Sequence, residues 1–150
     1  MARGVTLIEL ILVAAILGIL AATVIPRFHP RLLINKEVET ASKALVADLR
    51  LTRQLALSNK TRYYLQLNTG AHTYALYQTS VSPANQVGNT RTLQSNIGIS
   101  GDSTFGFEAN GSAIMGQGTA VTFSVSTQQW TVTVTVATGR ITWRNSSASS

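Results

Sequence analysis

The chain has 150 residues, of which 12% are charged, and a formal net charge of +6. This length suits one domain with an N-terminal segment, and the positive charge favours anionic partners such as nucleic acid or lipid headgroups. Cysteine is absent, which excludes disulfides, thiol nucleophiles and thiolate metal sites.

Residues 5–25 form an almost purely apolar run. As a helix rising ~1.5 Å per residue, this run spans roughly 30 Å, which is the hydrocarbon thickness of a bilayer. A secretory signal peptide has a shorter apolar region and a small-residue cleavage site, whereas Ile25-Pro26-Arg27-Phe28 follows here. We therefore predict a transmembrane and assembly helix over residues 5–30, with a kink at Pro26.

Glu9 is the single acid within the apolar run. A carboxylate in lipid is costly and usually functional. If the chain is cut after Gly4, Val5 carries a new amino group one helical turn before Glu9. In a bundle of such helices, the ammonium of one copy would neutralise Glu9 of another and fix their register. We interpret Glu9 as a device for assembly into a polymer.

The stretch Gly4-Val5-Thr6-Leu7-Ile8-Glu9-Leu10, with its apolar run and Pro26, resembles the class III signal of type IV pilins and type II secretion pseudopilins. The resemblance implies that residues 1–4 are a leader, which a prepilin peptidase removes between Gly4 and Val5 before methylating Val5. A phenylalanine is usual where Val5 stands. The resemblance also implies that Glu9 directs assembly with other pilins.

The same resemblance implies a location and a set of partners. The chain is expected in the bacterial inner membrane, in contact with lipid, with residues 31–150 forming a periplasmic globular domain. From there it would enter a pilus or a secretion pseudopilus.

Residues 35–59 have the spacing of one amphipathic helix. Its apolar stripe comprises Val38, Ala41, Leu45, Leu49, Thr52 and Ala56. Lys36, Lys43 and Arg50 recur every seven residues on the opposite side, which indicates either a solvated face or a ridge that faces nucleic acid or a partner.

Residues 61–144 are predicted to be rich in strands, because short runs alternate apolar and polar residues. Residues 61–67 and 72–78 flank Asn68-Thr69-Gly70-Ala71, a hairpin signal, and the polar residues 79–91 predict a loop. Further strands are expected within residues 92–100, 103–108, 119–125, 130–137 and 140–144, followed by a polar tail at 145–150. The expected fold is α+β, with a long N-terminal helix packed on antiparallel sheet.

The second half resembles the FimT/GspH branch of minor pilins and pseudopilins, through "LRLTRQLALSNKTRYYL", "FGFEANGSA" and the final "TGRITWR". The function this implies is that of a minor subunit at or near a filament tip, supporting assembly. We find no catalytic set, phosphate loop or metal spacing, so neither enzyme activity nor a cofactor is expected. His29 and His72 are given surface or structural roles.

Double-stranded DNA is the alternative partner, because a basic segment near the Gly-Arg pair is associated with DNA uptake for natural transformation in the FimT part of this branch. On a strand, Arg140 and Arg144 share one face and Trp143 the other. Two phosphate contacts are weak and salt-sensitive, so Lys60, Arg62 or Arg91 would have to extend the patch. The alternative without a DNA-binding function is a pair of solvated arginines that protect an edge strand from aggregation.

Overall fold

The computed structural model describes residues 6–24 and 30–146. These fall into two compact units, residues 1–32 and 33–150. The proposed cut site at Gly4 and Val5, the kink at Pro26 and the end of the tail lie outside the described residues. The predicted segment 5–30 is therefore described only in part.

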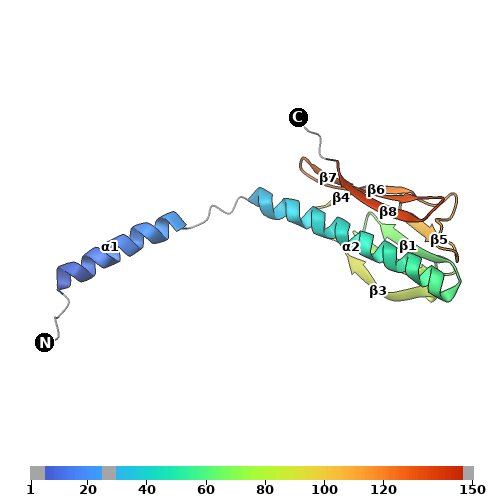
Figure 1. Ribbon diagram of the computed structural model, residues 1–150, viewed down its shortest axis with the longest axis horizontal. Coiled ribbons are helices and arrows are strands. Elements are labelled where there is room, and N and C mark those ends of the chain that lie inside the picture. Colours follow the sequence, from blue (N-terminus) through green and yellow to red (C-terminus); the bar gives the residue numbers. More distant parts are fainter. Residues whose placement is uncertain (1–5, 25–29, 147–150) are drawn as a thin grey trace. The chain divides into compact units, whose positions relative to one another are not determined.

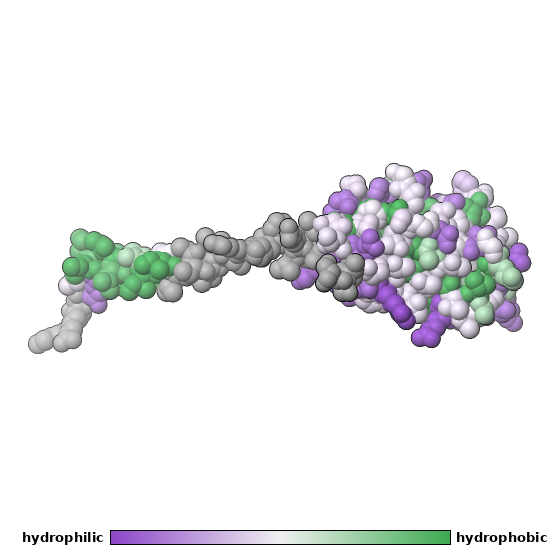
Figure 2. Space-filling view, turned by 90° about the horizontal axis from the view of Figure 1, so that it is seen from above, coloured by the Kyte–Doolittle hydropathy of each residue, from purple (hydrophilic) through white to green (hydrophobic). Residues whose placement is uncertain are grey.

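The first unit contains helix α1, Leu7–Val24, which has Glu9 in its first turn (Figure 1). The apolar side chains of residues 7–19 are exposed along the whole of this stretch, so the helix buries none of them within its own unit. Figure 2 shows the resulting apolar surface on the described part of α1. Within residues 6–24 and 30–146, we find no helix that combines the length and apolarity needed to cross a membrane.

Helix α2, Pro30–Asn59, begins five residues earlier than the sequence indicated. Pro30 stands at its first position, where a missing backbone N–H costs nothing, so this proline starts the helix. The predicted apolar stripe is confirmed, since Val38, Leu45 and Leu49 are fully buried. Lys36, Lys43 and Arg50 are all exposed on the other side, as expected.

Two four-stranded antiparallel sheets complete the second unit (Figure 1). The first has the order β3-β2-β1-β5 and the second β4-β6-β7-β8. Their bounds are β1 Tyr63–Asn68, β2 Thr73–Gln78, β3 Gln86–Thr92, β4 Gly98–Gly101, β5 Thr104–Phe107, β6 Ala120–Val125, β7 Gln128–Thr135 and β8 Arg140–Asn145. The fold is α+β, as predicted.

One hydrophobic core joins α2 to both sheets. Leu45 and Leu49 of the helix belong to the same buried cluster as Phe105 of the first sheet and Phe123 of the second. The alternation seen in the sequence is the physical cause, because it gives strands such as β1, β6 and β7 one apolar face that must be covered.

The loop predicted over residues 79–91 is wrong at its C-terminal end, where β3 begins at Gln86. This strand lies at the edge of its sheet and most of its side chains are exposed, so it carries no apolar alternation. Backbone pairing with β2 forms it, with a register shift between Tyr74 and Leu76. An edge strand that forms through pairing with its neighbour cannot be predicted from the pattern of its own side chains.

Candidate functional site

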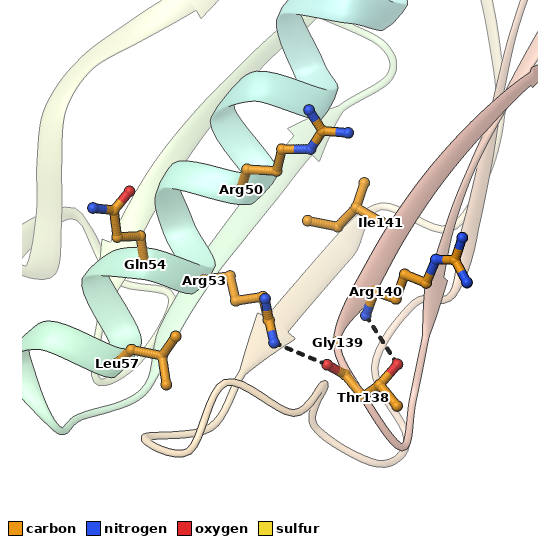
Figure 3. A pocket seen from close by; sticks show the side chains of 8 residues that line it. All are labelled: Arg50, Arg53, Gln54, Leu57, Thr138, Gly139, Arg140 and Ile141. Carbon is orange, nitrogen blue, oxygen red and sulfur yellow. Dashed lines mark hydrogen bonds between the residues drawn. The ribbon is translucent and has the colours of Figure 1, made fainter.

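A groove of about 610 Å³ lies between the C-terminal half of α2 and the turn that joins β7 to β8 (Figure 3). We call it the arginine groove; its lining residues are Arg50, Arg53, Gln54, Leu57, Thr138, Gly139, Arg140 and Ile141. Arg50 and Arg53 are three apart on the helix, so both reach the same side of it. The cationic side chains of the groove, Arg50 and Arg53, therefore come from the helix, and the β7–β8 turn forms the opposite wall.

Arg53 connects three segments of the second unit. Its Nε donates a hydrogen bond to the carbonyl oxygen of Gly111 at 2.8 Å, and its Nη2 donates to that of Thr138 at 3.1 Å. These bonds use part of the five-donor guanidinium and fix its plane, while the remaining N–H groups stay available for an anion.

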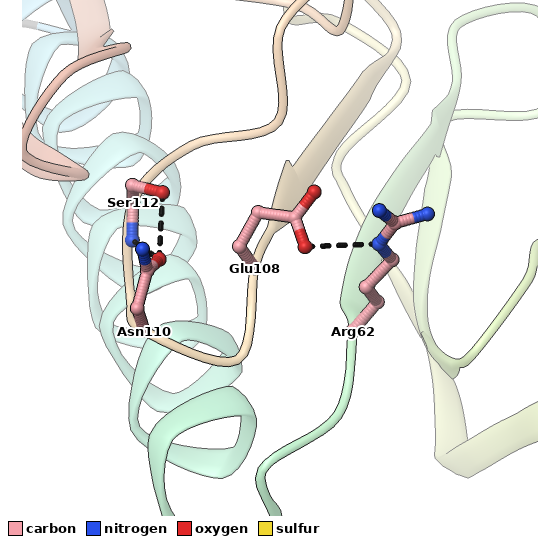
Figure 4. Close-up of polar contacts among 4 residues, drawn as sticks. All are labelled: Arg62, Glu108, Asn110 and Ser112. Atoms are coloured by element: carbon pink, nitrogen blue, oxygen red, sulfur yellow. Dashed lines mark hydrogen bonds and ion pairs between the residues drawn. The ribbon is translucent and has the colours of Figure 1, made fainter.

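The turn at residues 109–112 supplies one of the two acceptors. The Oδ1 of Asn110 accepts hydrogen bonds from the backbone N–H and the hydroxyl of Ser112, at 3.0 and 2.7 Å (Figure 4). Gly111 between them has a φ of 80°, in the left-handed region that glycine adopts without strain. This turn thus places the Gly111 carbonyl where Arg53 can reach it.

Gly139 is required by the close approach of the two turns. Its φ is 61°, and a Cβ there would overlap the carbonyl oxygen of Gly111 and lie 3.0 Å from Nε of Arg53. The Gly-Arg pair of the sequence is therefore explained first by packing: glycine lets the β7–β8 turn approach the turn at residues 109–112.

Arg140 and Arg144 lie on the exposed face of β8, as the alternation predicts. Ile141 is buried between them, and Trp143 packs against the core on the opposite face. Trp143 also stacks on Trp130, with ring centroids 4.7 Å apart, so Trp143 is a packing residue in this structure. In Figure 3 the Arg140 guanidinium points away from α2, and only its backbone side faces the groove.

Two of the other predicted DNA-binding residues are held by carboxylates. Nε of Arg62 lies 2.9 Å from Oε2 of Glu108 (Figure 4), an exposed ion pair that raises the pKa of Arg62. Nη2 of Arg91 lies 3.2 Å from Oδ1 of Asp48, whose side chain is buried. These two cations are thus partly neutralised within the protein.

Asp48 is held from its other side as well. The hydroxyl of Tyr74 donates a hydrogen bond to Oδ2 of Asp48 at 2.7 Å. Burial, and then the adjacent carboxylate, raise the pKa of Tyr74, because both disfavour a phenolate there. Arg91 therefore helps tie β3 to α2, a structural role that its position in the sequence did not reveal.

Lys60 is exposed just beyond the C-terminus of α2, with a φ of 49°. It does not line the arginine groove.

Of the five residues predicted to bind DNA, only Arg140 lines the arginine groove, which also contains Arg50 and Arg53. Among the described residues, no carboxylate forms an ion pair with Arg50, Arg53, Arg140 or Arg144. Arg53 was not singled out in the sequence; its i, i+3 spacing from Arg50 was the available signal.

Comparison with solved structures identifies this architecture. The type IV minor pilin FimU of Pseudomonas aeruginosa superposes with a TM-score of 0.61 at 16% identity, over 75% of this chain and 92% of FimU. The fold is that of the type IV minor pilins and minor pseudopilins. The minor pseudopilin EpsH of the Vibrio cholerae type 2 secretion system superposes with a TM-score of 0.54 at 14% identity, over 76% of this chain and 99% of EpsH. No protein-family model and no curated protein matches the sequence.

Each candidate functional feature lies within one of the two units. The arginine groove and the exposed face of β8 both belong to the second unit, which carries the two sheets. Glu9 belongs to the first unit, in the exposed apolar helix.

Proposed function

We propose that the chain is a minor pilin or minor pseudopilin, incorporated at or near the tip of a type IV pilus or type II secretion pseudopilus, where it supports assembly. One observation carries the proposal: a pilin-like α+β unit follows an apolar helix whose side chains are exposed in its own unit. Assembly with like helices would cover them.

The apolar surface of α1 provides the driving force for burial. Leu7 and Ile8 are 79% and 75% exposed, and large apolar side chains follow through Ile19. Burying one such side chain contributes roughly 1.5–3 kcal/mol. The stabilisation is non-directional, so it does not by itself fix how neighbouring helices align.

Glu9 supplies the alignment in this proposal. Its carboxylate is the single charge in α1, and it lies in the first turn of the helix. The prepilin peptidase would cut between Gly4 and Val5 and expose an ammonium near that turn. A neighbouring copy's carboxylate would pair with this ammonium, and any other alignment would leave a charge buried alone.

Membrane residence before assembly is part of the same proposal. The segment 5–30 would lie in the lipid of the bacterial inner membrane, with residues 31–150 in the periplasm. Arg3 in the leader favours a cytoplasmic N-terminus. A protease-protection assay on spheroplasts tests this orientation, since a C-terminal epitope should be digested without lysis.

Glu9→Ala tests the role in assembly. The variant should be processed normally but be lost from sheared filaments, measured by immunoblot against the membrane fraction. Glu39→Ala is the matched control, because Glu39 is an acid of α2 that forms an ion pair with the nearby Lys43. Normal incorporation of Glu9→Ala would count against the alignment role.

The cut site has its own test. Mass spectrometry of the mature protein should find Val5, with an added methyl group, at the N-terminus. Gly4→Ala should accumulate as the uncut form. Efficient processing of Gly4→Ala, or a mature N-terminus elsewhere, would reject the assignment.

DNA binding is a second candidate function, favoured by the absence of acidic partners for four arginines in the described part of the second unit: Arg50, Arg53, Arg140 and Arg144. Arg140 and Arg144 alternate on one strand and would contact phosphates from its exposed face. The groove arginines would add charge beside them. Lys60 would contribute only if DNA extends past the end of α2.

A gel shift of the purified full-length chain with duplex DNA, at low and physiological salt, tests this candidate. Replacing Arg140 and Arg144 together by Gln should weaken binding and reduce the salt slope by about 2, one unit per lost phosphate contact. Lys43→Gln combined with Arg62→Gln removes the same charge from two ion-paired sites and should change little. Equal losses in both pairs would indicate non-specific attraction.

A further inference from the structure

A second groove lies between the N-terminal half of α2 and the connection from β3 to β4. Its volume is about 550 Å³, within the range of ligand pockets. Thr40, Ala41 and Ala44 line the helix side, and their small side chains leave the space open. Leu93 and Ile97 line the opposite side and are almost fully buried, so this part of the groove is apolar.

The rim of this groove is cationic. Lys36 is exposed there, and no carboxylate among the described residues forms an ion pair with it. Arg91 lies on the rim, held by Asp48, and more than half of its side chain remains exposed. Glu37 also lies there, but its Oε2 accepts a hydrogen bond from Nδ2 of Asn96 at 3.0 Å. The groove therefore fits an apolar side chain, with a carboxylate from a neighbouring residue placed against the cationic rim.

The same chain presents such a group. Met115 is 86% exposed, more than any other large apolar side chain described in residues 36–146. The turn that carries Met115 is fixed at both ends by backbone hydrogen bonds. The N–H of Ile114 donates to the carbonyl oxygen of Gly106 at 2.9 Å, and the N–H of Gly118 donates to the carbonyl oxygen of Thr104 at 2.7 Å. A pre-ordered turn loses little entropy on docking, and a methionine side chain adapts to an irregular groove.

Asp102 supplies the carboxylate next to this turn. Its Oδ2 accepts hydrogen bonds from the backbone N–H groups of Thr119, at 2.6 Å, and Ala120, at 3.1 Å. Gly118 approaches Asp102 so closely that a Cβ at Gly118 would overlap the aspartate side chain. The backbone hydrogen bonds lower the pKa of Asp102, so the carboxylate is charged at neutral pH.

We propose that two copies of this chain dock through unlike surfaces, with Met115 of one copy entering the groove between α2 and residues 91–97 of the other. Asp102 of the first copy would then face Lys36 of the second. The turn and the groove share no residue, so the contact is heterologous and can add copies without closing a ring. It needs two adjacent copies and does not depend on the proposed function.

The charges make this pairing selective. With a net charge of +6, two copies repel each other at most relative orientations. Docking that places one of the few carboxylates against a free lysine relieves this repulsion locally, and an exposed apolar side chain is buried at the same time.

Cross-linking tests the contact cleanly, because the chain has no cysteine. Full-length Met115→Cys and Thr40→Cys, carrying different tags, are co-expressed and oxidised in intact cells. We expect the two-tag dimer at a yield at least 10-fold above that of Met115→Cys with Ser58→Cys, which places the second thiol at the exposed far end of α2. Equal yields, or a Met115→Cys adduct with a different protein only, would overturn the proposal.

A charge reversal provides the second measurement. Lys36→Glu in the Thr40→Cys copy should reduce the two-tag dimer several-fold, whereas Lys60→Glu should not. If both reversals act alike, the contact is not the one proposed. Repeating the experiment in the Glu9→Ala background separates this contact from filament assembly, since the dimer should persist there.

Discussion

Replacing Gly139 by Ala should destabilise the second unit by about 4 kcal/mol. Two separate terms contribute to this loss. The φ of 61° costs a residue with a side chain about 1–2 kcal/mol. The added Cβ would also overlap the Gly111 carbonyl oxygen, which accepts the hydrogen bond from Arg53, and losing that charge-assisted bond costs about 1.5–3 kcal/mol.

Gly88→Ala is the control for the first term alone. Gly88 has a φ of 75°, but nothing lies within 4 Å of a Cβ at that position. Its substitution should cost about 1–2 kcal/mol. The difference between the two variants isolates the contact between the β7–β8 turn and the residues that surround it.

Thermal unfolding of the purified full-length variants, followed by circular dichroism, measures both changes. For a unit of this size, about 4 kcal/mol corresponds to a fall in Tm of roughly 15 °C. A Gly139→Ala variant that unfolds at the same temperature as Gly88→Ala would show that the β7–β8 turn moves away from the turn at residues 109–112 at no cost. The packing explanation of the Gly-Arg pair would then be refuted.

Three further predictions concern buried or capped polar groups. Asp48→Ala should lower the free energy of unfolding by about 3 kcal/mol in urea titrations, because the buried Tyr74 hydroxyl loses its acceptor and Arg91 its anion; an unchanged midpoint would contradict this. The raised pKa of Tyr74 means that the folded chain holds this proton more tightly than the unfolded one, so stability should fall as pH rises above about 10, and less steeply in Tyr74→Phe. The lowered pKa of Asp102 has the opposite effect on the pH dependence of stability: the stabilisation is present above the usual aspartate pKa and is lost as pH falls below it. The fall in Tm at acid pH should therefore be smaller in Asp102→Ala than in the wild type. An equal fall in both proteins would show that the backbone hydrogen bonds to Asp102 contribute nothing.

The sequence determined the elements whose periodicity comes from burial. The stripe from Val38 to Ala56 and the alternation in residues 119–144 each require one apolar face, so helix and strands follow directly from the order of side chains. The same alternation placed Arg140 and Arg144 on one face of β8 and Trp143 on the other. The hairpin at residues 68–71 was equally local, because its turn residues specify their own backbone.

Tertiary structure alone decided which charges remain free. Arg62 and Arg91 were indistinguishable in the sequence from Arg140 and Arg144, yet their carboxylate partners come from segments 46 and 43 residues away: Glu108 and Asp48. The strand β3 likewise depends on pairing with β2, and the pattern of its own side chains does not predict that pairing. Periodicity is a property of neighbours along the chain, whereas an ion pair or an edge strand depends on distances that only the packed core sets.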